Sequence, residues 1–356
     1  MTSTWDANGF RAAVQTSLDA FVSEQALRLA PLGDDADRLV EAAHAAVSGG
    51  KRFRAAFCYW GFHAVAGSAD EVEDALLRAC AALELLHASA LVHDDSMDAS
   101  DTRRGRPATH RGFAVEHRAD GWRGDPEQYG ASAAILLGDL LLSWSDELLR
   151  RCGLPLERVV AALDVFDRCR SEVITGQFLD VSVQARASSD VDQAMRVLRY
   201  KSAKYSVERP LHVGAALAGA GADVLEALTH FGLPLGEAFQ LRDDLLGVYG
   251  DPDVTGKPAG DDLTEGKRTV LVALALQRAP TADAKLLDDA LGSPLAPAEV
   301  EDLRRIIEAC GAHAEVERRI DQLTAASLAA LDDAPVTDLA RRVLRDLTAA
   351  ATQRTI

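Results

Sequence analysis

Two long stretches with little or no glycine and proline set the tightest limit on how this chain can fold. Residues 70–98 contain no glycine and no proline, and residues 222–249 show similar patterning around a Gly-Leu-Pro at 232–234. Alanine and leucine dominate the composition, which is 48% hydrophobic but only 5% aromatic. That balance favours helix over sheet. Because apolar residues follow the 3.6-residue period of a helix from about residue 8 onwards, we expect an all-α fold in a single domain, 1–356.

Charge and cysteine usage exclude several classes of protein. The net charge of −17 argues against binding to nucleic acid or to anionic lipid. Five scattered cysteines with no CxxC pair suggest neither a zinc site nor a disulfide framework. The first ten residues do not resemble a signal peptide, and no uninterrupted apolar run approaches the roughly 18 residues that span a bilayer. We therefore expect a cytoplasmic protein without a transmembrane segment.

The first acidic cluster is HDDSMD, at residues 93–98. If residues 84–98 form a helix, Asp94 and Asp98 share a face with His87, and they lie one turn apart, about 6 Å along the axis. They could then ligate one divalent ion or a close pair of ions, while Asp95 would point towards the rim. A solvated helix end is the simpler alternative. Carboxylates at a helix C-terminus oppose the helix dipole, however, so structure alone does not favour them there.

Two basic segments accompany this cluster. RRGRP at 103–107 follows it directly, and arginines beside carboxylates suit the binding of a metal-bound diphosphate. SGGKRFR at 48–54 is predicted to begin a helix, with Lys51 and Arg54 on one face. Backbone amides at a helix start, together with these two cations, would form an anion site.

The second acidic cluster is RDDLLG, at residues 242–247. Gln240, Asp243 and Gly247 share a helix face, so position 247 lacks the carboxylate that Asp98 supplies in the first cluster. The loop after it carries Lys257 and Lys267 between glycines. Its glycine spacing misses a P-loop by one residue. We interpret the loop as a lid over a phosphate.

The motifs together resemble those of the trans-isoprenyl diphosphate synthases, the polyprenyl synthetase family. The resemblance covers roughly residues 45–270 and is greatest to the geranylgeranyl-type enzymes of bacteria. It rests on GGKRFR at 49–54, ELLHASALVHDDSMD at 84–98, RRGRPATH at 103–110, GD at 138–139, GQFLD at 176–180, KSAKY at 201–205, FQLRDDLLG at 239–247 and GKPAGDDLTEGKRT at 256–269.

The resemblance implies a fold, a reaction and a set of partners. The fold is an isoprenoid-synthase-type helical bundle around a deep central cavity, with the two acidic clusters facing each other at its mouth. The reaction is the head-to-tail condensation of isopentenyl diphosphate with an allylic diphosphate. Three Mg²⁺ ions, for which Mn²⁺ could substitute, and a homodimer are implied as well.

The resemblance also implies roles for individual residues. The metal-binding residues would be Asp94, Asp95, Asp98, Asp243 and Asp244. Isopentenyl diphosphate would be bound by Lys51, Arg54, His87 and Arg104. The allylic diphosphate would be bound by Arg103, Lys201, Ser202, Gln240, Lys257 and Lys267. Gln177 and Asp180 would not bind the substrates themselves but would position these residues. The family's second cluster usually ends in aspartate where this chain has Gly247, and activity is expected to survive that change.

The length of the product depends on how deep the cavity runs below Asp94. Ser89 and Ala90 are small, whereas farnesyl-specific relatives usually carry an aromatic ring there. Tyr59 and Trp60 could form a lower floor. We therefore expect a C20 product, geranylgeranyl diphosphate, with C15 and C25 or longer as alternatives.

Two other functions share this fold. A class I terpene cyclase would use the same metal chemistry, but it has no need for Lys51, Arg54 and Arg104 as a second diphosphate site. An inactive partner subunit of a heteromeric synthase is the other alternative. Such subunits usually lose the first cluster, which is intact here.

Overall fold

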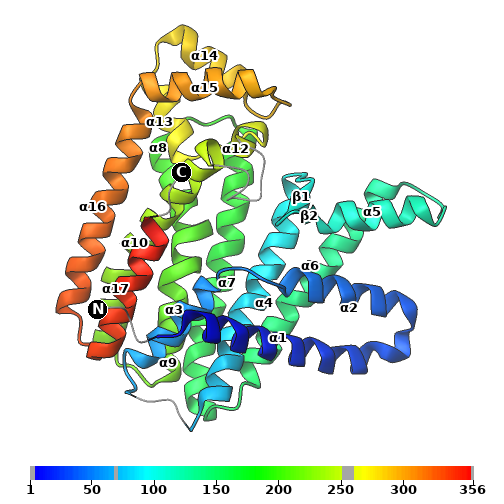
Figure 1. The fold of residues 1–356 in the computed structure, drawn as a ribbon, viewed down its shortest axis with the longest axis vertical. Coiled ribbons are helices and arrows are strands. Elements are labelled where there is room, and N and C mark those ends of the chain that lie inside the picture. Colours follow the sequence, from blue (N-terminus) through cyan, green and yellow to red (C-terminus); the bar gives the residue numbers. More distant parts are fainter. Residues whose placement is uncertain (1–4, 68–70, 251–259, 354–356) are drawn as a thin grey trace. The chain divides into compact units, whose positions relative to one another are not determined.

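The protein, described here by a computed structural model, is helical almost throughout (Figure 1). The structure describes residues 5–67, 71–250 and 260–353. Within these ranges the only sheet is a hairpin of two-residue strands, so the all-α prediction is confirmed. Contacts divide the chain into two compact units, Met1–Tyr59 with Ala66–Leu163 and Trp60–Val65 with Asp164–Ile356. The single domain expected from the sequence remains a prediction.

The first unit is built around a long helix that carries the first acidic cluster. Its elements are α1 (Ala7–Leu29), η1 (Ala30–Leu32), α2 (Asp34–Val47), the start of α3 (Phe53–His63), α4 (Glu73–Met97), β1 (Thr102–Arg103), β2 (Arg106–Pro107), α5 (Thr109–Ala119), α6 (Pro126–Arg150) and the start of α7 (Leu156–Ala185). Helix α4 packs against α1 and α6, and α5 packs along α6.

Local sequence explains where several of these helices begin. The carboxylate of Asp6 accepts hydrogen bonds from the backbone N–H groups of Asn8 and Gly9 and so caps α1. At α6 the cap is Asp125, followed by Pro126 at the first helical position, where a missing N–H costs nothing. Helix α4 lacks a side-chain cap, but it buries a continuous run from Ala79 to Leu86. Burial on several faces therefore holds α4 in place.

The second unit carries the second acidic cluster. Besides the rest of α3 and α7, it contains α8 (Val191–Val197), η2 (Leu198–Glu208), α9 (Arg209–Leu217), α10 (Ala222–Tyr249), α12 (Asp261–Thr264), α13 (Val270–Arg278), α14 (Thr281–Ala290), α15 (Pro297–Ala309), α16 (Ala312–Asp333) and α17 (Asp338–Thr352). Helix α10 packs against η2 and against α16. An apolar core that includes Leu241, Leu245 and Val248 of α10 joins it to α13 and α16.

Two motif segments have an unusual backbone. KSAKY at 201–205 lies inside η2, a π-helix that runs without a break from α8 into α9. No glycine or proline stops the helix at that point. SGGKRFR at 48–54 was predicted to begin a helix, and α3 begins within it, at Phe53. Gly49, Gly50 and Arg52 all have positive φ, which a right-handed helix excludes.

One helix in the described part of the chain, α4, is long and apolar enough to cross a membrane by length and composition. Of its most apolar window, 72% is buried inside the protein. Glu84 and His87 interrupt the apolar run of this helix in the sequence. Its burial is that of a core helix in a globular protein.

Candidate active site

The first acidic cluster occupies the last turn of α4. Asp94 and Asp98 are both partly buried, and the backbone N–H of Asp98 closes the helix on the carbonyl of Asp94 at 2.8 Å. Asp95 was expected at the rim, and that expectation is wrong: it is only 3% exposed. The Arg103 guanidinium donates from Nε to both of its carboxylate oxygens, at 2.8 and 3.0 Å. Asp95 therefore anchors Arg103 beside the cluster.

The turn that follows brings a second arginine next to the SGGKRFR segment. Strands β1 and β2 form a hairpin whose turn, Arg104-Gly105, has positive φ at both residues. From there Arg104 donates from Nη1 to the carbonyl of Ser48 at 2.8 Å. A Cβ at Gly50 would lie 3.0 Å from Nη2 of the same arginine. Gly50 thus leaves room for the close approach of the Arg104 guanidinium.

Arg52 of the same segment forms a buried ion pair with Glu84 of α4, which the sequence indicated only indirectly. Arg52 is 5% exposed and donates from Nη1 to Oε2 of Glu84 at 3.0 Å. Glu84 also accepts a hydrogen bond from the backbone N–H of Ala55 at 3.2 Å. The signal available in the sequence was Glu84 itself, a charge within the apolar run ALELLHA. A buried charge needs a partner, and here that partner fixes the segment that carries Lys51 and Arg54.

His87 lies among arginines. Burial lowers the pKa of His87 well below its usual range, and the charges of Arg54, Arg104, Arg103 and Arg52 lower it further. The structure thus brings together three of the four residues expected to bind isopentenyl diphosphate, Arg54, His87 and Arg104. A neutral imidazole surrounded by guanidinium groups suits an anion, whose charge the arginines balance.

A histidine of the first cluster has a structural partner that the sequence did not predict. His93 lies with Nε2 3.2 Å from the carbonyl oxygen of Ile135 and 3.5 Å from Oδ1 of Asp139, both on α6. A Cβ at Gly138 would lie 2.1 Å from His93 Nε2. The Gly-Asp pair at 138–139 therefore makes room for the end of α4 and binds it.

The second acidic cluster has one exposed and one buried aspartate. Asp243 is exposed, whereas Asp244 is 6% exposed and accepts a hydrogen bond from Nε2 of Gln240 at 2.8 Å. Burial raises the pKa of the Asp244 carboxyl well above its usual range. The Gln240 hydrogen bond opposes that rise, while the carboxylates of Asp262 and Asp243 add to it. Asp262, on α12, was not among the predicted site residues.

Lys201 is bound by the residue that was predicted to support it. Its Nζ lies 2.6 Å from Oδ2 of Asp180 on α7. The π-helix that carries Lys201 and Ser202 contacts its neighbours very closely, because a Cβ at Gly176 of α7 would lie 2.5 Å from the Lys201 backbone nitrogen. On α10, a Cβ at Gly236 would lie 2.4 Å from the Ala203 carbonyl oxygen. Single stretches of π-helix are frequent at functional sites.

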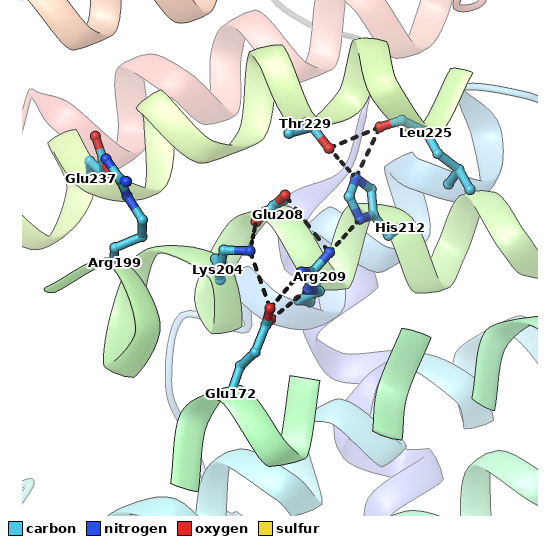
Figure 2. A network of polar contacts seen from close by, with 9 residues as sticks. All are labelled: Glu172, Arg199, Lys204, Glu208, Arg209, His212, Leu225, Thr229 and Glu237. Atoms are coloured by element: carbon cyan, nitrogen blue, oxygen red, sulfur yellow. Dashed lines mark hydrogen bonds and ion pairs between the residues drawn. The ribbon is translucent and has the colours of Figure 1, made fainter. Parts of the chain in front are cut away.

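A partly buried ionic network connects the same π-helix to α7 farther along. Figure 2 shows Glu172 of α7 pointing towards Lys204 and Arg209. The Arg209 guanidinium donates from Nε and Nη2 to the two oxygens of Glu172, each at 2.7 Å, and Lys204 Nζ lies 3.2 Å from Oε1. The network restrains both ends of the segment between Lys204 and Arg209. Gln177, on α7 beside Gly176, is partly buried.

Two predicted lysines belong to the segment after α10. Lys267 is partly buried, with Nζ 3.4 Å from Oδ1 of Asp262 and in contact with the carboxylate of Glu265. Lys257 lies outside the described residues. The loop predicted after the second acidic cluster is in part helical, since α12 spans Asp261–Thr264.

Of the residues expected to set the length of the product, the two on α4 are small and at least partly buried. Ser89 is 2% exposed and Ala90 is partly buried. Tyr59 is engaged by the first unit: its ring centroid lies 5.0 Å from that of Phe10, and its hydroxyl lies 3.3 Å from Oε2 of Glu73. Trp60, which belongs to the second unit, is 3% exposed, with its ring 5.3 Å from His63.

The carboxylates of the two acidic clusters suit a metal ion that a substrate also binds. Among the described residues, no group of three or more His, Cys, Asp or Glu side chains converges as ligands for one metal. Each cluster offers one or two carboxylates instead, and burial, together with the charges of Asp262 and Asp243, raises the pKa of the Asp244 carboxyl. Mg²⁺ is typically held in this way, by one or two carboxylates, water and the phosphates of a substrate. The residues present therefore fit Mg²⁺.

Comparison with known proteins identifies the family. The polyprenyl synthetase family model matches residues 36–310. The crystal structure of geranylgeranyl pyrophosphate synthase from Corynebacterium glutamicum, complexed with isoprenyl diphosphate and magnesium, is 42% identical with a TM-score of 0.96, covering 99% of this chain and 100% of that one. Geranylgeranyl diphosphate synthase of Mycobacterium tuberculosis is 36% identical over 294 residues, 82% of this chain and 77% of that protein. Geranylfarnesyl diphosphate synthase of Aeropyrum pernix is 34% identical over 247 residues, 68% of this chain and 72% of that protein.

These matches confirm the all-α fold and the class of enzyme that the motifs indicated, a short-chain trans-prenyltransferase. The chain belongs to the polyprenyl synthetase family.

Proposed function

We propose that this protein condenses isopentenyl diphosphate head to tail with an allylic diphosphate to give geranylgeranyl diphosphate, C20. The observation that carries the proposal is the group formed by Arg54, His87 and Arg104 next to the first aspartate cluster. It is a site for a second diphosphate, which a synthase needs and a cyclase with one diphosphate substrate does not.

The two clusters and their cations would divide the two substrates between them. Asp94, Asp98 and Asp243 would hold three Mg²⁺ ions, replaceable by Mn²⁺, with Asp95 and Asp244 in support. The bound ions would supply charge neutralisation for the departing diphosphate. Lys51, with the arginine–histidine group, would hold isopentenyl diphosphate. The allylic diphosphate would be held by Arg103, Lys201, Ser202, Gln240, Lys257 and Lys267, with Gln177 and Asp180 behind them.

The chain's own residues account for the remaining chemistry. Arg103, Lys201 and Lys267 would lower the charge of the leaving diphosphate as the allylic C–O bond breaks. Apolar residues such as those of α4 would keep water from the carbocation. The double bond of isopentenyl diphosphate attacks, and the released diphosphate takes the proton, so no basic side chain is required.

Small residues below the first cluster support the C20 product. Ser89 and Ala90 present no ring that would block a growing chain at that level of α4. Relatives named for C20 and for C25 products are among the matches. Tyr59, which is held by Phe10 and Glu73, would contribute to the floor together with Trp60.

We also propose a homodimer in the cytoplasm. Apolar side chains are exposed on two packed helices of the first unit, Val115 of α5 at 59%, Ile135 of α6 at 52% and Leu136 of α6 at 62%. A second copy would cover such a surface. All five cysteines are free, which suits a reducing compartment.

The decisive experiment supplies radiolabelled isopentenyl diphosphate and Mg²⁺ with each of the C5, C10 and C15 allylic primers, followed by chromatography of the products. We expect C20 product from the wild type, almost none from Asp94→Asn, and wild-type product from Asp120→Asn, an exposed aspartate at the end of α5. Hydrocarbon released from an allylic diphosphate alone would identify a cyclase. No turnover by the purified wild type would identify a partner subunit.

A further inference from the structure

Gly247 and Asp262 compete for one small space. A Cβ at Gly247 would lie 1.9 Å from Oδ2, 2.4 Å from Cγ and 3.0 Å from Oδ1 of Asp262. Such distances are far inside van der Waals contact, so no side chain at 247 fits while Asp262 stays in place. Position 247 is where the family's second cluster usually has its last aspartate. In this chain a carboxylate is present at that place, but it comes from α12.

The electrostatics tie Asp262 to the second cluster. Asp262 is 9% exposed, and its charge, with that of Asp243, acts on the buried carboxyl of Asp244. The Lys267 ammonium, 3.4 Å from Oδ1, is the cation recorded at its side. Burying carboxylates close to one another is costly unless cations balance them. A divalent cation would offset that cost.

The surroundings of α12 hold Asp262 in this place. The carbonyl of Asp262 accepts a hydrogen bond from the Lys267 N–H at 2.9 Å, and the carbonyl of Leu263 accepts one from Gly292 at 3.0 Å. Leu263 is fully buried in the apolar core of the second unit. Gly260, which precedes α12, has a φ of 76°, a conformation that favours glycine. The backbone that carries Asp262 is therefore held in place.

We propose that Asp262 replaces, from α12, the carboxylate that Gly247 does not provide, and that it completes the Mg²⁺-binding part of the second cluster. The inference rests on the proposed function, because it assumes that Asp243 and Asp244 bind metal together with a diphosphate. It assigns Gly247 a role as well, since only glycine leaves the space that Asp262 fills.

The test measures Mg²⁺ binding without turnover. The melting temperature is followed during titration with Mg²⁺ at a fixed concentration of inorganic diphosphate, and the Mg²⁺ concentration at half-maximal stabilisation is compared between variants. Asp262→Asn keeps the shape and removes the charge. We expect it to need about tenfold more Mg²⁺, the usual scale for losing a supporting group at a metal site. Asp283→Asn, an exposed aspartate on α14, is the charge-matched control and should match the wild type.

A pair of variants tests the shared space. Gly247→Asp alone places two carboxylates in one space, so we expect a lower melting temperature without metal and a weaker response to Mg²⁺. The double variant G247D/D262A frees that space and returns the carboxylate to α10, so its Mg²⁺ midpoint should come back to within about threefold of the wild type, a small difference in binding energy.

Two results would overturn the inference. One is an Asp262→Asn midpoint equal to that of the wild type. The other is a double variant that melts like the wild type without metal yet responds as weakly as Asp262→Asn. In both cases the wild type still responds to Mg²⁺ with diphosphate, and the proposed function stands. If the wild type itself shows no response, the proposed function fails and this inference fails with it.

Discussion

The Arg52 guanidinium donates to the Glu84 carboxylate at 3.0 Å, and neither residue is more than 5% exposed. Arg52 belongs to the predicted diphosphate-binding segment at 48–54, but its side chain is buried against Glu84 of α4. Arg52 also has a φ of 55°, a conformation that costs a non-glycine residue about 1–2 kcal/mol. The ion pair therefore holds the chain in the strained path that leads from Gly50 to the start of α3.

Removing the charge of Glu84 is expected to destabilise the protein. Glu84→Gln leaves Arg52 buried without its counter-charge, which costs about 3–5 kcal/mol in free energy of unfolding. Urea denaturation followed by circular dichroism measures this change. The control is Glu116→Gln, which loses a half-exposed pair with Arg38 and should cost less than about 1 kcal/mol. A similar small loss for both variants would show that the buried pair does not stabilise the fold.

The long helices could be predicted from the sequence, whereas the partners of their charged residues could not. Asp94 and Asp243 lie on helices, and Asp98 is the C-cap of α4, because apolar periodicity determines α4 and α10. Asp95 was placed at the rim from its helical angle alone. It is buried because Arg103 returns through a hairpin, which no periodicity reveals.

Other features depend on contacts that are remote in sequence. The π-helix η2 has almost the same residue pattern as an α-helix, and its surroundings include Gly176 and Gly236 on two other helices. Helical periodicity relates Gly247 only to residues of the same helix, such as Gln240 and Asp243, and not to Asp262. Asp262 lies close to Gly247 because α12 packs against α10, a contact that the sequence pattern does not reveal.

The ion pair between Asp180 and Lys201 is expected to control the affinity for the allylic diphosphate. Asp180→Asn leaves the Lys201 ammonium without the carboxylate that positions it at 2.6 Å. Hydrogen bonds between charged groups contribute about 1.5–3 kcal/mol, so KM for the allylic substrate should rise about tenfold or more. Steady-state kinetics with each substrate varied separately gives the result. Asp167→Asn, an exposed residue of α7 that pairs with Arg170, should leave KM unchanged. An Asp180→Asn enzyme with normal KM would exclude the positioning role.

The close contact at Gly236 predicts that even one methyl group there is harmful. In Gly236→Ala the new Cβ would lie 2.4 Å from the Ala203 carbonyl oxygen, so η2 must shift together with Lys201 and Ser202. We expect a loss of about 1–3 kcal/mol in stability and a lower kcat. The matched control is Gly112→Ala on α5, where the Cβ would meet nothing within 4 Å. That change should stabilise its helix by up to about 1 kcal/mol. Equal melting temperatures for the two variants would contradict the prediction.

An aromatic side chain at position 89 of α4, before the first acidic cluster, is expected to shorten the product. Ser89 is 2% exposed on α4, so Ser89→Phe must place its ring in the space around that position. If growing chains extend past it, the main product should change from C20 to C15, while the rate of the first condensation is retained. Product chromatography gives the distribution. Leu286→Phe, at an exposed position on α14, serves as the control and should leave the product unchanged. A Ser89→Phe enzyme that still makes C20 would show that the chain takes another path.

The His212 side chain predicts a specific dependence of stability on pH. Burial lowers its pKa to about 4, and the charge of Arg209 contributes. Figure 2 shows Nδ1 facing Arg209, 3.2 Å away, while Nε2 donates to the Leu225 carbonyl at 3.0 Å. The imidazole is therefore neutral with its proton on Nε2, and a second proton would have to face a guanidinium group.

The sign of the effect follows from the lowered pKa. Because the unfolded pKa is near 6.5, the contribution of His212 is fully present above that pH and is lost as the pH falls towards about 4, by about 3 kcal/mol in total. His212→Gln should therefore lose less stability than the wild type between pH 6.5 and 4.5, as measured by melting temperature. His230→Gln, at an exposed position on α10, should keep the steeper wild-type dependence. Parallel curves for the wild type and His212→Gln would show that His212 is not held neutral by its surroundings.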